Sequence, residues 1–244
     1  MIAAGNFQAD TLRAGAAQTA LPMKLFPEGI AVAFSDPRSE APALWATEAA
    51  AVARAAPRRR VEFAAGRAAA RAAMVRLGLP PAPVPAGPDR APVWPRGLTG
   101  SLTHNQTLCI AAVARSDAFR AIGVDVEEDA PLPEDLIATI CTLAERAWLA
   151  CQPSQTRGHL ARLIFSAKEC AYKCQYSVTG QIFDFDTLEI TPDLDTGQFE
   201  ATFVRSIGPF AAGTCLSGRS WRGQGVIATG MALAAAPRWG LGGV

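Results

Sequence analysis

An α+β fold is predicted by three features of the sequence. Short runs rich in β-branched residues alternate with longer runs in which apolar residues recur at helical spacing, and both kinds of run occur in each half of the chain. The 244 residues are enough to bury a substantial core, as one large domain or two small ones. A hydrophobic fraction of 50% with 18% charged residues is typical of a globular protein and not of a disordered one.

The first half of the chain is expected to hold three strands and two helices. Residues 1–20 are small and polar, with few large hydrophobic side chains, and are expected to be mobile. A proline-rich run over residues 79–88 predicts a stiff, extended connector without helix. The predicted strands cover residues 29–34, 98–102 and 108–114, and the predicted helices cover residues 43–54 and 61–77, with a break at Pro57.

The second half is expected to begin after a turn at residues 115–118. A strand at 121–127 is followed by a helix at 134–151 and then by a helix of about five turns, which begins near Leu160 and ends before Gly180. Three further strands are predicted near residues 188–190, 199–205 and 225–234.

Two acidic side chains share one face of the strand at residues 121–127. Because successive side chains of a strand point to opposite faces, Asp125 and Glu127 point the same way, while Val124 and Val126 point into the core. Two carboxylates on one face repel each other unless a cation lies between them, and Mg²⁺ prefers hard oxygen ligands together with substrate phosphates. The alternative is a strand end whose acids are simply solvated.

A second charged segment lies on the helix that follows. Glu169 and Lys173 are four residues apart and therefore share a face, whereas Lys168 projects about 100° away from Glu169. One interpretation is an ion pair that stabilises the helix by about 0.3 kcal/mol. The other is a third metal carboxylate, Glu169, beside a lysine that is aimed at phosphate.

Four segments, taken in order, resemble one known family. The patterns G-x-D-x-E at residues 123–127 and F-S-x-K-E-x-x-x-K at residues 165–173 resemble the signature of the 4′-phosphopantetheinyl transferases. Two upstream segments, residues 60–71 and 92–104, resemble the siderophore-synthetase branch of this family. One such segment is a weak indication, but four in the same order are a strong one.

The resemblance implies a fold and a division of the chain. It implies two similar α+β subdomains related by a pseudo-twofold, with the active site in the cleft between them. The expected N-terminal subdomain covers residues 21–117, after the tail at residues 1–20, and the C-terminal subdomain, which carries the metal site, covers residues 118–244. Because both walls of the cleft would come from one chain, a monomer is expected.

The resemblance also implies an activity. The 4′-phosphopantetheine of coenzyme A would pass to a serine of an apo acyl or peptidyl carrier protein of nonribosomal peptide, polyketide or siderophore synthesis, with release of 3′,5′-ADP. Mg²⁺, or Mn²⁺ in its place, would bridge the coenzyme A pyrophosphate. The implied metal ligands are Asp125, Glu127 and Glu169. The implied catalytic residues are Glu169 as base for the serine hydroxyl, Lys173 at the leaving phosphate, and Lys168 near the diphosphate. A carboxylate that is bound to Mg²⁺ is a poor base, so the two roles of Glu169 conflict.

Seven residues are implied in coenzyme A binding. His104 and Thr103 match the family segment that contacts the nucleotide phosphates, although a capping threonine and a structural histidine would give the same pattern. Asn105 departs from relatives that often have a small residue there. Glu145 resembles a family glutamate, and a solvent-exposed helical acid is an equal alternative. The implied coenzyme A contacts are Arg60, Arg67, Arg90, Thr103, His104, Lys168 and Lys173.

Net charge, the length of the apolar runs and the cysteine spacing count against several other classes of protein. The formal net charge of +1 creates no overall electrostatic field that would attract nucleic acid or a membrane surface. No apolar run approaches the roughly 18 residues of a membrane helix, and the start of the chain lacks the order of a signal peptide. The 6 cysteines form no C-x-x-C pair, which favours free thiols and a cytoplasmic protein.

Two other functions remain open at this point. The first is a non-catalytic module that binds coenzyme A or a carrier protein with the same fold; the presence of Asp125, Glu127, Glu169 and Lys173 counts against it. The second is a different Mg²⁺-dependent phosphoryl-transfer enzyme. The sequence has no glycine-rich phosphate loop, which counts against a nucleotidase of the P-loop kind.

Overall fold

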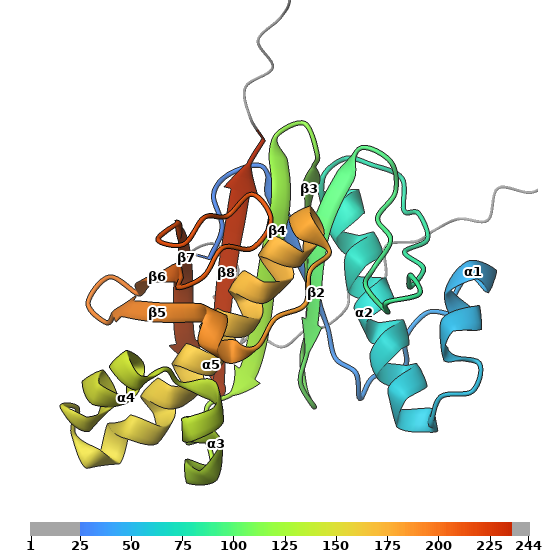
Figure 1. The fold of residues 1–244 in the computed structure, drawn as a ribbon. Helices are drawn as coiled ribbons and strands as arrows, with labels where there is room; N and C mark the ends of the chain where they lie inside the picture. Colours follow the sequence, from blue (N-terminus) through green and yellow to red (C-terminus); the bar gives the residue numbers. More distant parts are fainter. Residues whose placement is uncertain (1–24, 236–244) are drawn as a thin grey trace, which may run out of the picture.

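The computed structural model describes residues 25–235, so the segment expected to be mobile, residues 1–20, lies outside the described residues. Within them the chain forms two antiparallel sheets and five α-helices, which confirms the α+β prediction (Figure 1). One sheet is built from the first half of the chain and the other from the second half, and the change occurs at the turn between residues 115 and 119.

The N-terminal sheet has three strands in the order β1-β3-β2. The helix α2 packs on β3 and β1 and covers one face of this sheet. Its first residue is Pro57, which suits the first turn because a proline lacks an N–H group and has a preset φ. The elements are β1 (Ile30–Ser35), α1 (Ala46–Ala49), a 3₁₀ turn (Ala50–Val52), α2 (Pro57–Arg76), β2 (Leu98–His104) and β3 (Cys109–Arg115).

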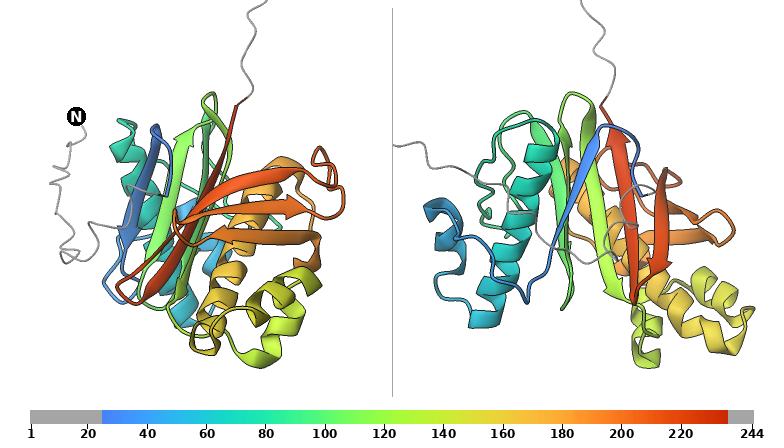
Figure 2. Two further views of the ribbon diagram at one scale, coloured as in Figure 1. Left: turned by 90° about the vertical axis from the view of Figure 1, so that its left-hand side faces the viewer. Right: turned by 180° about the vertical axis from the view of Figure 1, so that it is seen from behind.

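The C-terminal sheet has five strands in the order β4-β8-β7-β6-β5. The long helix α5 packs across β4 and β8. Seen from behind, these strands lie in front of α5 (Figure 2). The elements are β4 (Phe119–Glu128), α3 (Glu134–Ile140), α4 (Leu143–Ala150), α5 (Ser154–Thr179), a 3₁₀ turn η3 (Phe185–Thr187), β5 (Leu188–Asp193), β6 (Gln198–Phe203), β7 (Cys215–Gly223) and β8 (Val226–Ala234).

Three expectations for the second half are corrected by the structure. The helix predicted at residues 134–151 is two helices, because Cys141 is extended and Thr142 starts α4 with a capping box to Glu145. The helix α5 has 26 residues and begins at Ser154, so it is longer than the predicted five turns. The strand β7 was not predicted, because Cys215–Gly223 has few large apolar residues and its Gly, Ser and Arg content masks the alternation.

The two sheets meet where β2 lies beside β4 without a backbone ladder. Instead, hydroxyl groups of β2 accept hydrogen bonds from the backbone of β4. The Val124 amide donates to Ser101 Oγ at 3.1 Å, and the Val126 amide donates to Thr103 Oγ1 at 3.3 Å. Because side chains replace the ladder, the strands do not close into one sheet, and the carboxylates of β4 lie beside the end of β2.

The close packing of α5 on β4 depends on Gly123. A Cβ atom placed on this glycine would lie 2.0 Å from the carbonyl oxygen of Cys170, which is far inside van der Waals contact. The helix backbone therefore rests directly on the strand at this point. This crossing places the next turn of α5, with Lys173, beside Asp125, the second residue after the glycine.

Candidate functional site

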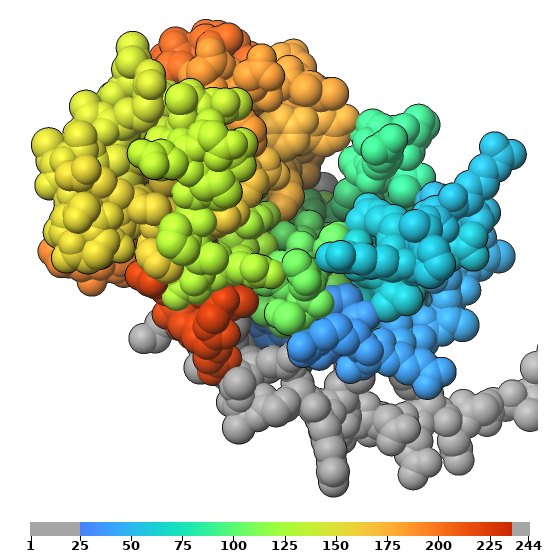
Figure 3. Space-filling model, turned by 90° about the horizontal axis from the view of Figure 1, so that it is seen from below, coloured from blue at the N-terminus to red at the C-terminus, as the bar shows by residue number. Residues whose placement is uncertain are grey.

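A cavity of about 350 Å³ lies between the two halves of the molecule. Figure 3 shows the molecule hollowed between the orange segment of the second half and the teal and cyan segments of the first half. Four elements and one connecting loop contribute its walls: α2, the loop before β2, β2, β4 and α5. The lining residues are Arg59, Glu62, Phe63, Gly66, Arg67, Arg90, Pro92, Leu102, Thr103, His104, Asp125, Glu127, Phe165, Glu169 and Lys173.

The centre of the cavity is an ion pair between β4 and α5. The Lys173 ammonium lies 2.6 Å from Asp125 Oδ1, and the Thr103 hydroxyl donates to the same oxygen at 3.1 Å. Burial alone would lower the pKa of Lys173, but the adjacent carboxylates of Asp125 and Glu169 outweigh it and raise that pKa above its ordinary value. Lys173 is therefore held as a cation at the cavity wall.

The other oxygen of Asp125 has no partner. Oδ2 of this carboxylate is buried and makes no hydrogen bond in the structure. An orphaned carboxylate oxygen facing a polar cavity is costly unless a cation or a donor reaches it. Asp125 thus has one oxygen committed to Lys173 and one that is open to a further positive group.

Glu127 lies on the same face of β4, as the strand alternation predicted. Its pKa is raised to about 7, mainly by burial and next by the charge of Asp125, although Arg162 and Lys173 oppose the shift. The Arg162 guanidinium donates to Glu127 Oε2 at 3.0 Å. Val124 and Val126, on the opposite face, are fully buried, as expected.

Glu169 projects from α5 into the same cavity. Burial raises the pKa of its carboxyl group, and the charge of Asp125 adds to this, while Lys173 lowers it. Burial therefore disfavours the charged form of Glu169 more than the neighbouring Lys173 favours it. Glu169 also lines a second, smaller pocket, described below, so it stands between two hollows.

The donor set of Asp125, Glu127 and Glu169 fits a hard divalent cation, but it is not assembled around one. Among residues 25–235 no three His, Cys, Asp or Glu side chains lie close enough together to hold a metal ion as they stand. Two observations support a fit with Mg²⁺: the orphaned Asp125 oxygen and the raised pKa of Glu127. The first is a carboxylate oxygen that is open to a cation; the second is mainly an effect of burial, to which repulsion by Asp125 adds and which a bound cation would relieve.

Basic groups gather on the N-terminal wall of the cavity. The Arg59 guanidinium lies 2.9 Å from His104 Nε2, and because an arginine only donates, that nitrogen must be the unprotonated one. Burial first, and then the charges of Arg59 and Lys173, lower the pKa of His104, while Glu62 opposes this. A neutral histidine with an adjacent guanidinium is suited to an anionic ligand.

Arg67 also lines the cavity but supports the loop above it. Its Nε donates to the Val84 carbonyl at 2.7 Å, and its guanidinium lies 3.8 Å from the Phe63 ring centre. Burial lowers its pKa to about 10, so it remains charged at neutral pH. Arg90, on that loop, faces the same cavity.

Arg60 is not brought to the cavity. Its guanidinium donates back to the carbonyl oxygens of Ala53 and Ala55, on the exposed side of α2. Arg59 takes its place on the cavity wall; it belongs to the basic cluster at residues 58–76, part of which the resemblance places near coenzyme A, but Arg60 was the contact inferred from it. Helical periodicity was a usable signal, because Arg59, Glu62, Phe63, Gly66 and Arg67 are spaced i, i+3, i+4, i+7 and i+8 and so form one stripe.

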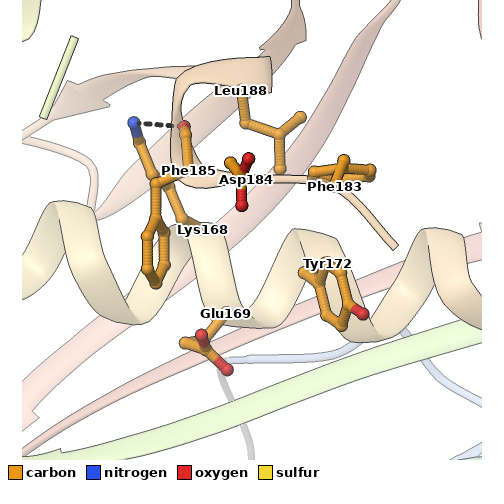
Figure 4. Close-up of a pocket in the computed structure, with 7 residues that line it drawn as sticks. All are labelled: Lys168, Glu169, Tyr172, Phe183, Asp184, Phe185 and Leu188. Atoms are coloured by element: carbon orange, nitrogen blue, oxygen red, sulfur yellow. Dashed lines mark hydrogen bonds between the residues drawn. The ribbon is translucent and has the colours of Figure 1, made fainter. Parts of the chain in front are cut away.

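Lys168 is also not brought to the cavity between the halves. Its ammonium forms a buried ion pair with Glu145 at 2.8 Å and donates to the carbonyl oxygens of Ile140 and Phe185. Figure 4 shows its side chain directed away from the Glu169 carboxylate. The 100° step between adjacent helical residues separates the two, so the Lys168 ammonium is directed to protein partners in the core and not into the larger cavity.

Glu145 is correspondingly buried and is not the solvent-exposed acid that the sequence left open. Its carboxylate accepts from the Ile190 amide at 2.7 Å and from the Thr142 amide at 2.7 Å. The signal was present in the sequence, because Thr142 and Glu145 form the T-x-x-E pattern of a capping box.

A smaller pocket of about 150 Å³ adjoins the other side of Glu169. Figure 4 shows three aromatic rings and the side chain of Leu188 arranged around it. Tyr172 meets Phe183 edge to face at 5.2 Å, so the wall is apolar and ordered by ring contacts. The lining residues are Lys168, Glu169, Tyr172, Phe183, Asp184, Phe185 and Leu188.

The sequence matches two family descriptions, which cover both halves of the cavity. Residues 47–114 match the 4′-phosphopantetheinyl transferase N-terminal domain, and residues 121–224 match the 4′-phosphopantetheinyl transferase superfamily. The chain belongs to this superfamily, whose members act on coenzyme A and carrier proteins.

Curated relatives agree with this assignment. The chain is 43% identical to 4′-phosphopantetheinyl transferase Svp of Streptomyces mobaraensis over 208 residues, which is 83% of this chain and 84% of Svp. It is 36% identical to 4′-phosphopantetheinyl transferase PptT of Mycobacterium tuberculosis over 220 residues, 88% of this chain and 94% of PptT. It is also 36% identical to enterobactin synthase component D of Escherichia coli over 133 residues, 53% and 61% of the two chains. The protein is therefore an enzyme of the phosphopantetheinyl transferase class.

Within residues 25–235 no helix is both long enough and apolar enough to cross a membrane.

Proposed function

We propose that this enzyme transfers 4′-phosphopantetheine from coenzyme A to a serine of an apo acyl or peptidyl carrier protein in a Mg²⁺-dependent reaction that releases 3′,5′-ADP. The observation that carries the proposal is one cavity in which three carboxylates of β4 and α5 face the cations of a lysine and three arginines, with a neutral histidine beside them. A ligand with several phosphates and one bound divalent cation would match both sets of charge.

Asp125, Glu127 and Glu169 are the residues that would hold Mg²⁺ in this proposal. When bound there, the cation would neutralise charge that develops on the coenzyme A pyrophosphate and make 3′,5′-ADP a better leaving group. Asp125 would offer its unpartnered oxygen, since its other oxygen is committed to Lys173.

The basic wall would bind the phosphates of coenzyme A. Arg59, His104 and Arg90 come from three separate segments and converge on one cavity, which suits a ligand with phosphates at more than one position. The smaller apolar pocket beyond Glu169 would accept the pantetheine arm. Glu169 lines both hollows, so the phosphate that joins the arm to the nucleotide would lie beside it.

The reaction joins the serine oxygen of the carrier protein to the phosphorus attached to the pantetheine arm and breaks the bond from that phosphorus to 3′,5′-ADP. The serine proton must leave as the new bond forms. Glu169, whose pKa is raised mainly by burial, is our candidate to accept it, and in that step Asp125 and Glu127 would hold the cation, because a Mg²⁺-bound carboxylate is a poor base. Lys173, held as a cation, would stabilise the oxygen of the departing phosphate.

We also propose that the chain is divided into two subdomains. An N-terminal subdomain at residues 21–117 and a C-terminal one at 118–244 would form the two walls of the active site. A monomer would be sufficient, since the cavity is lined from both halves of one chain. The carrier domains served would belong to nonribosomal peptide, polyketide or siderophore synthesis.

Intact-mass analysis of a carrier protein tests the proposal. Apo acyl and peptidyl carrier proteins would be incubated with this enzyme and coenzyme A, with Mg²⁺ or with excess chelator. A gain of one phosphopantetheine, roughly 340 Da, that requires the metal would support it. No gain on several carriers, with coenzyme A still bound, would instead favour a non-catalytic binding module.

A further inference from the structure

The connector between α2 and β2 ends in a tight loop that spans the cavity. Gly87 donates its amide to the Ala91 carbonyl at 2.8 Å, and Arg90 donates its amide to the Gly87 carbonyl at 2.9 Å. The Val93 amide donates to the Pro85 carbonyl at 2.9 Å and closes the base of the loop. The loop therefore has a defined internal structure, which the many prolines stiffen further.

One end of this loop is fixed to the N-terminal half. The buried residue Val84 accepts at its carbonyl from Arg67 and donates its amide to the Glu48 carboxylate at 3.0 Å. Glu48 in turn pairs with Arg71 of α2 at 2.8 Å. Hydrogen bonds to α2 and to Glu48 therefore fix the chain at Val84, just before the loop reaches the cavity.

The tip of the loop is bound to the opposite wall. The Tyr176 hydroxyl of α5 donates to Asp89 Oδ2 at 2.7 Å. The other oxygen of Asp89 accepts from the Ala91 amide at 3.1 Å, so the same carboxylate joins the loop to itself and to α5. Tyr176 is three residues beyond Lys173 and is stacked on Tyr172 at 5.8 Å, which limits its ring orientation.

The residue after Asp89 is Arg90, which lines the cavity in an unusual conformation. Its φ is +70°, in the left-handed region that residues other than glycine rarely adopt. Such a conformation persists only where neighbouring contacts hold it. The contacts on either side of Arg90 are those of Asp89 and Ala91, and Tyr176 is their link to α5.

We propose that Tyr176 is a positioning residue that, through its hydrogen bond to Asp89, holds Arg90 against the cavity for the phosphates of coenzyme A. The inference rests on the proposed function, since it takes coenzyme A as the ligand of Arg90. Tyr176 is not among the residues that line the cavity; its hydrogen bond joins α5 to the loop that carries the arginine.

Tyr176→Phe is the central test, because it removes the hydroxyl and keeps the ring. Coenzyme A affinity, measured by calorimetry on the full chain, is expected to fall about three- to tenfold, the effect of one net hydrogen bond, while kcat is unchanged. Ser177→Ala is the matched control, since it removes a hydroxyl on the same turn that bonds only the Lys173 carbonyl. An affinity for coenzyme A in Tyr176→Phe equal to that in Ser177→Ala would overturn the inference.

A double-mutant cycle shows whether Tyr176 acts through the arginine. In an Arg90→Gln background, Tyr176→Phe is expected to have no further effect on coenzyme A affinity, because the group that it positions is already gone. Full additivity of the two losses would contradict the inference and make Tyr176 an independent contact.

Hydrogen exchange separates this inference from the proposed function. The Arg90 and Ala91 amides are expected to exchange faster in Tyr176→Phe than in the unsubstituted protein, with no coenzyme A present. Unchanged exchange at both amides would overturn the positioning role even if coenzyme A binds. Faster exchange in a protein that does not bind coenzyme A would support the loop contact and refute the proposed function instead.

Discussion

Two lysines, five residues apart on α5, are in opposite environments. Lys168 is 1% exposed, and its ammonium has three oxygen partners: Glu145 and the carbonyls of Ile140 and Phe185. Lys173 is 27% exposed at the cavity wall, where its one short contact is with Asp125 and two others are at 3.4 Å. The first ammonium is saturated with protein partners, and the second is not.

The two lysines therefore have different roles on one helix: Lys168 stabilises the fold, and Lys173 is available to a ligand. An ammonium whose three donors all bond to protein oxygens in the core has no donor left for a ligand. Its removal leaves a buried carboxylate without its cation. An ammonium that faces a cavity and shares a carboxylate with an open oxygen is able to take a phosphate as an additional partner. The family pattern K-E-x-x-x-K contains both lysines, and only their surroundings distinguish them.

The largest expected effect is on the cavity side. Asp125→Asn keeps the size of the side chain and removes the charge that faces Lys173 and the proposed metal. Transfer to a carrier protein is expected to fall by about 10³-fold; the melting temperature is also expected to fall, because Lys173 loses the carboxylate that pairs with it at 2.6 Å. Asp195→Asn, in an exposed turn, is the control. Unchanged turnover in Asp125→Asn would remove this residue from the metal site.

The next effect is on the buried side and concerns stability. Lys168→Met leaves Glu145 buried without its cation, and the free energy of unfolding is expected to fall by about 3–5 kcal/mol in urea titrations. Lys168→Met combined with Glu145→Gln should lose less than Lys168→Met alone, because no buried charge remains unpaired. A single Lys168→Met variant as stable as the unsubstituted protein would refute the structural role of this pair.

Lys173→Gln sharpens the contrast between the two lysines. Because Lys173 is proposed to act on the departing phosphate, kcat is expected to fall about 100-fold while the dissociation constant of coenzyme A rises less than about tenfold. Single-turnover kinetics and calorimetry give the two numbers separately. Equal losses in rate and affinity would make Lys173 a binding residue only.

The smallest of these effects compares two adjacent arginines. Arg59→Gln is expected to weaken coenzyme A binding by about tenfold, since a charged hydrogen bond to phosphate would be lost. Arg60→Gln is its matched control and should change the affinity by less than about twofold, because Arg60 bonds to the backbone outside the cavity. The reverse order would mean that the N-terminus of α2 rearranges when ligand binds.

Local pattern was sufficient for most elements and for the carboxylates of β4. The alternation of Val124, Asp125, Val126 and Glu127 correctly predicted that the two valines lie in the core and that the two carboxylates share the cavity face, although Asp125 is buried as well. Period 3.6 likewise placed Glu169 and Lys173 on one face of α5 and Lys168 on another. The sequence alone therefore determined the α+β class, the family and the side of each element that bears the charged groups.

Only the tertiary structure decided where the charged groups find their partners. The contact of Gly123 with Cys170, the meeting of Tyr176 with Asp89 and the burial of Lys168 against Glu145 all join residues that are distant in sequence or on separate elements. A one-dimensional pattern gives the direction of a side chain relative to its own helix or strand. It does not give the residue that this side chain contacts on another element, because that contact depends on how closely the elements pack.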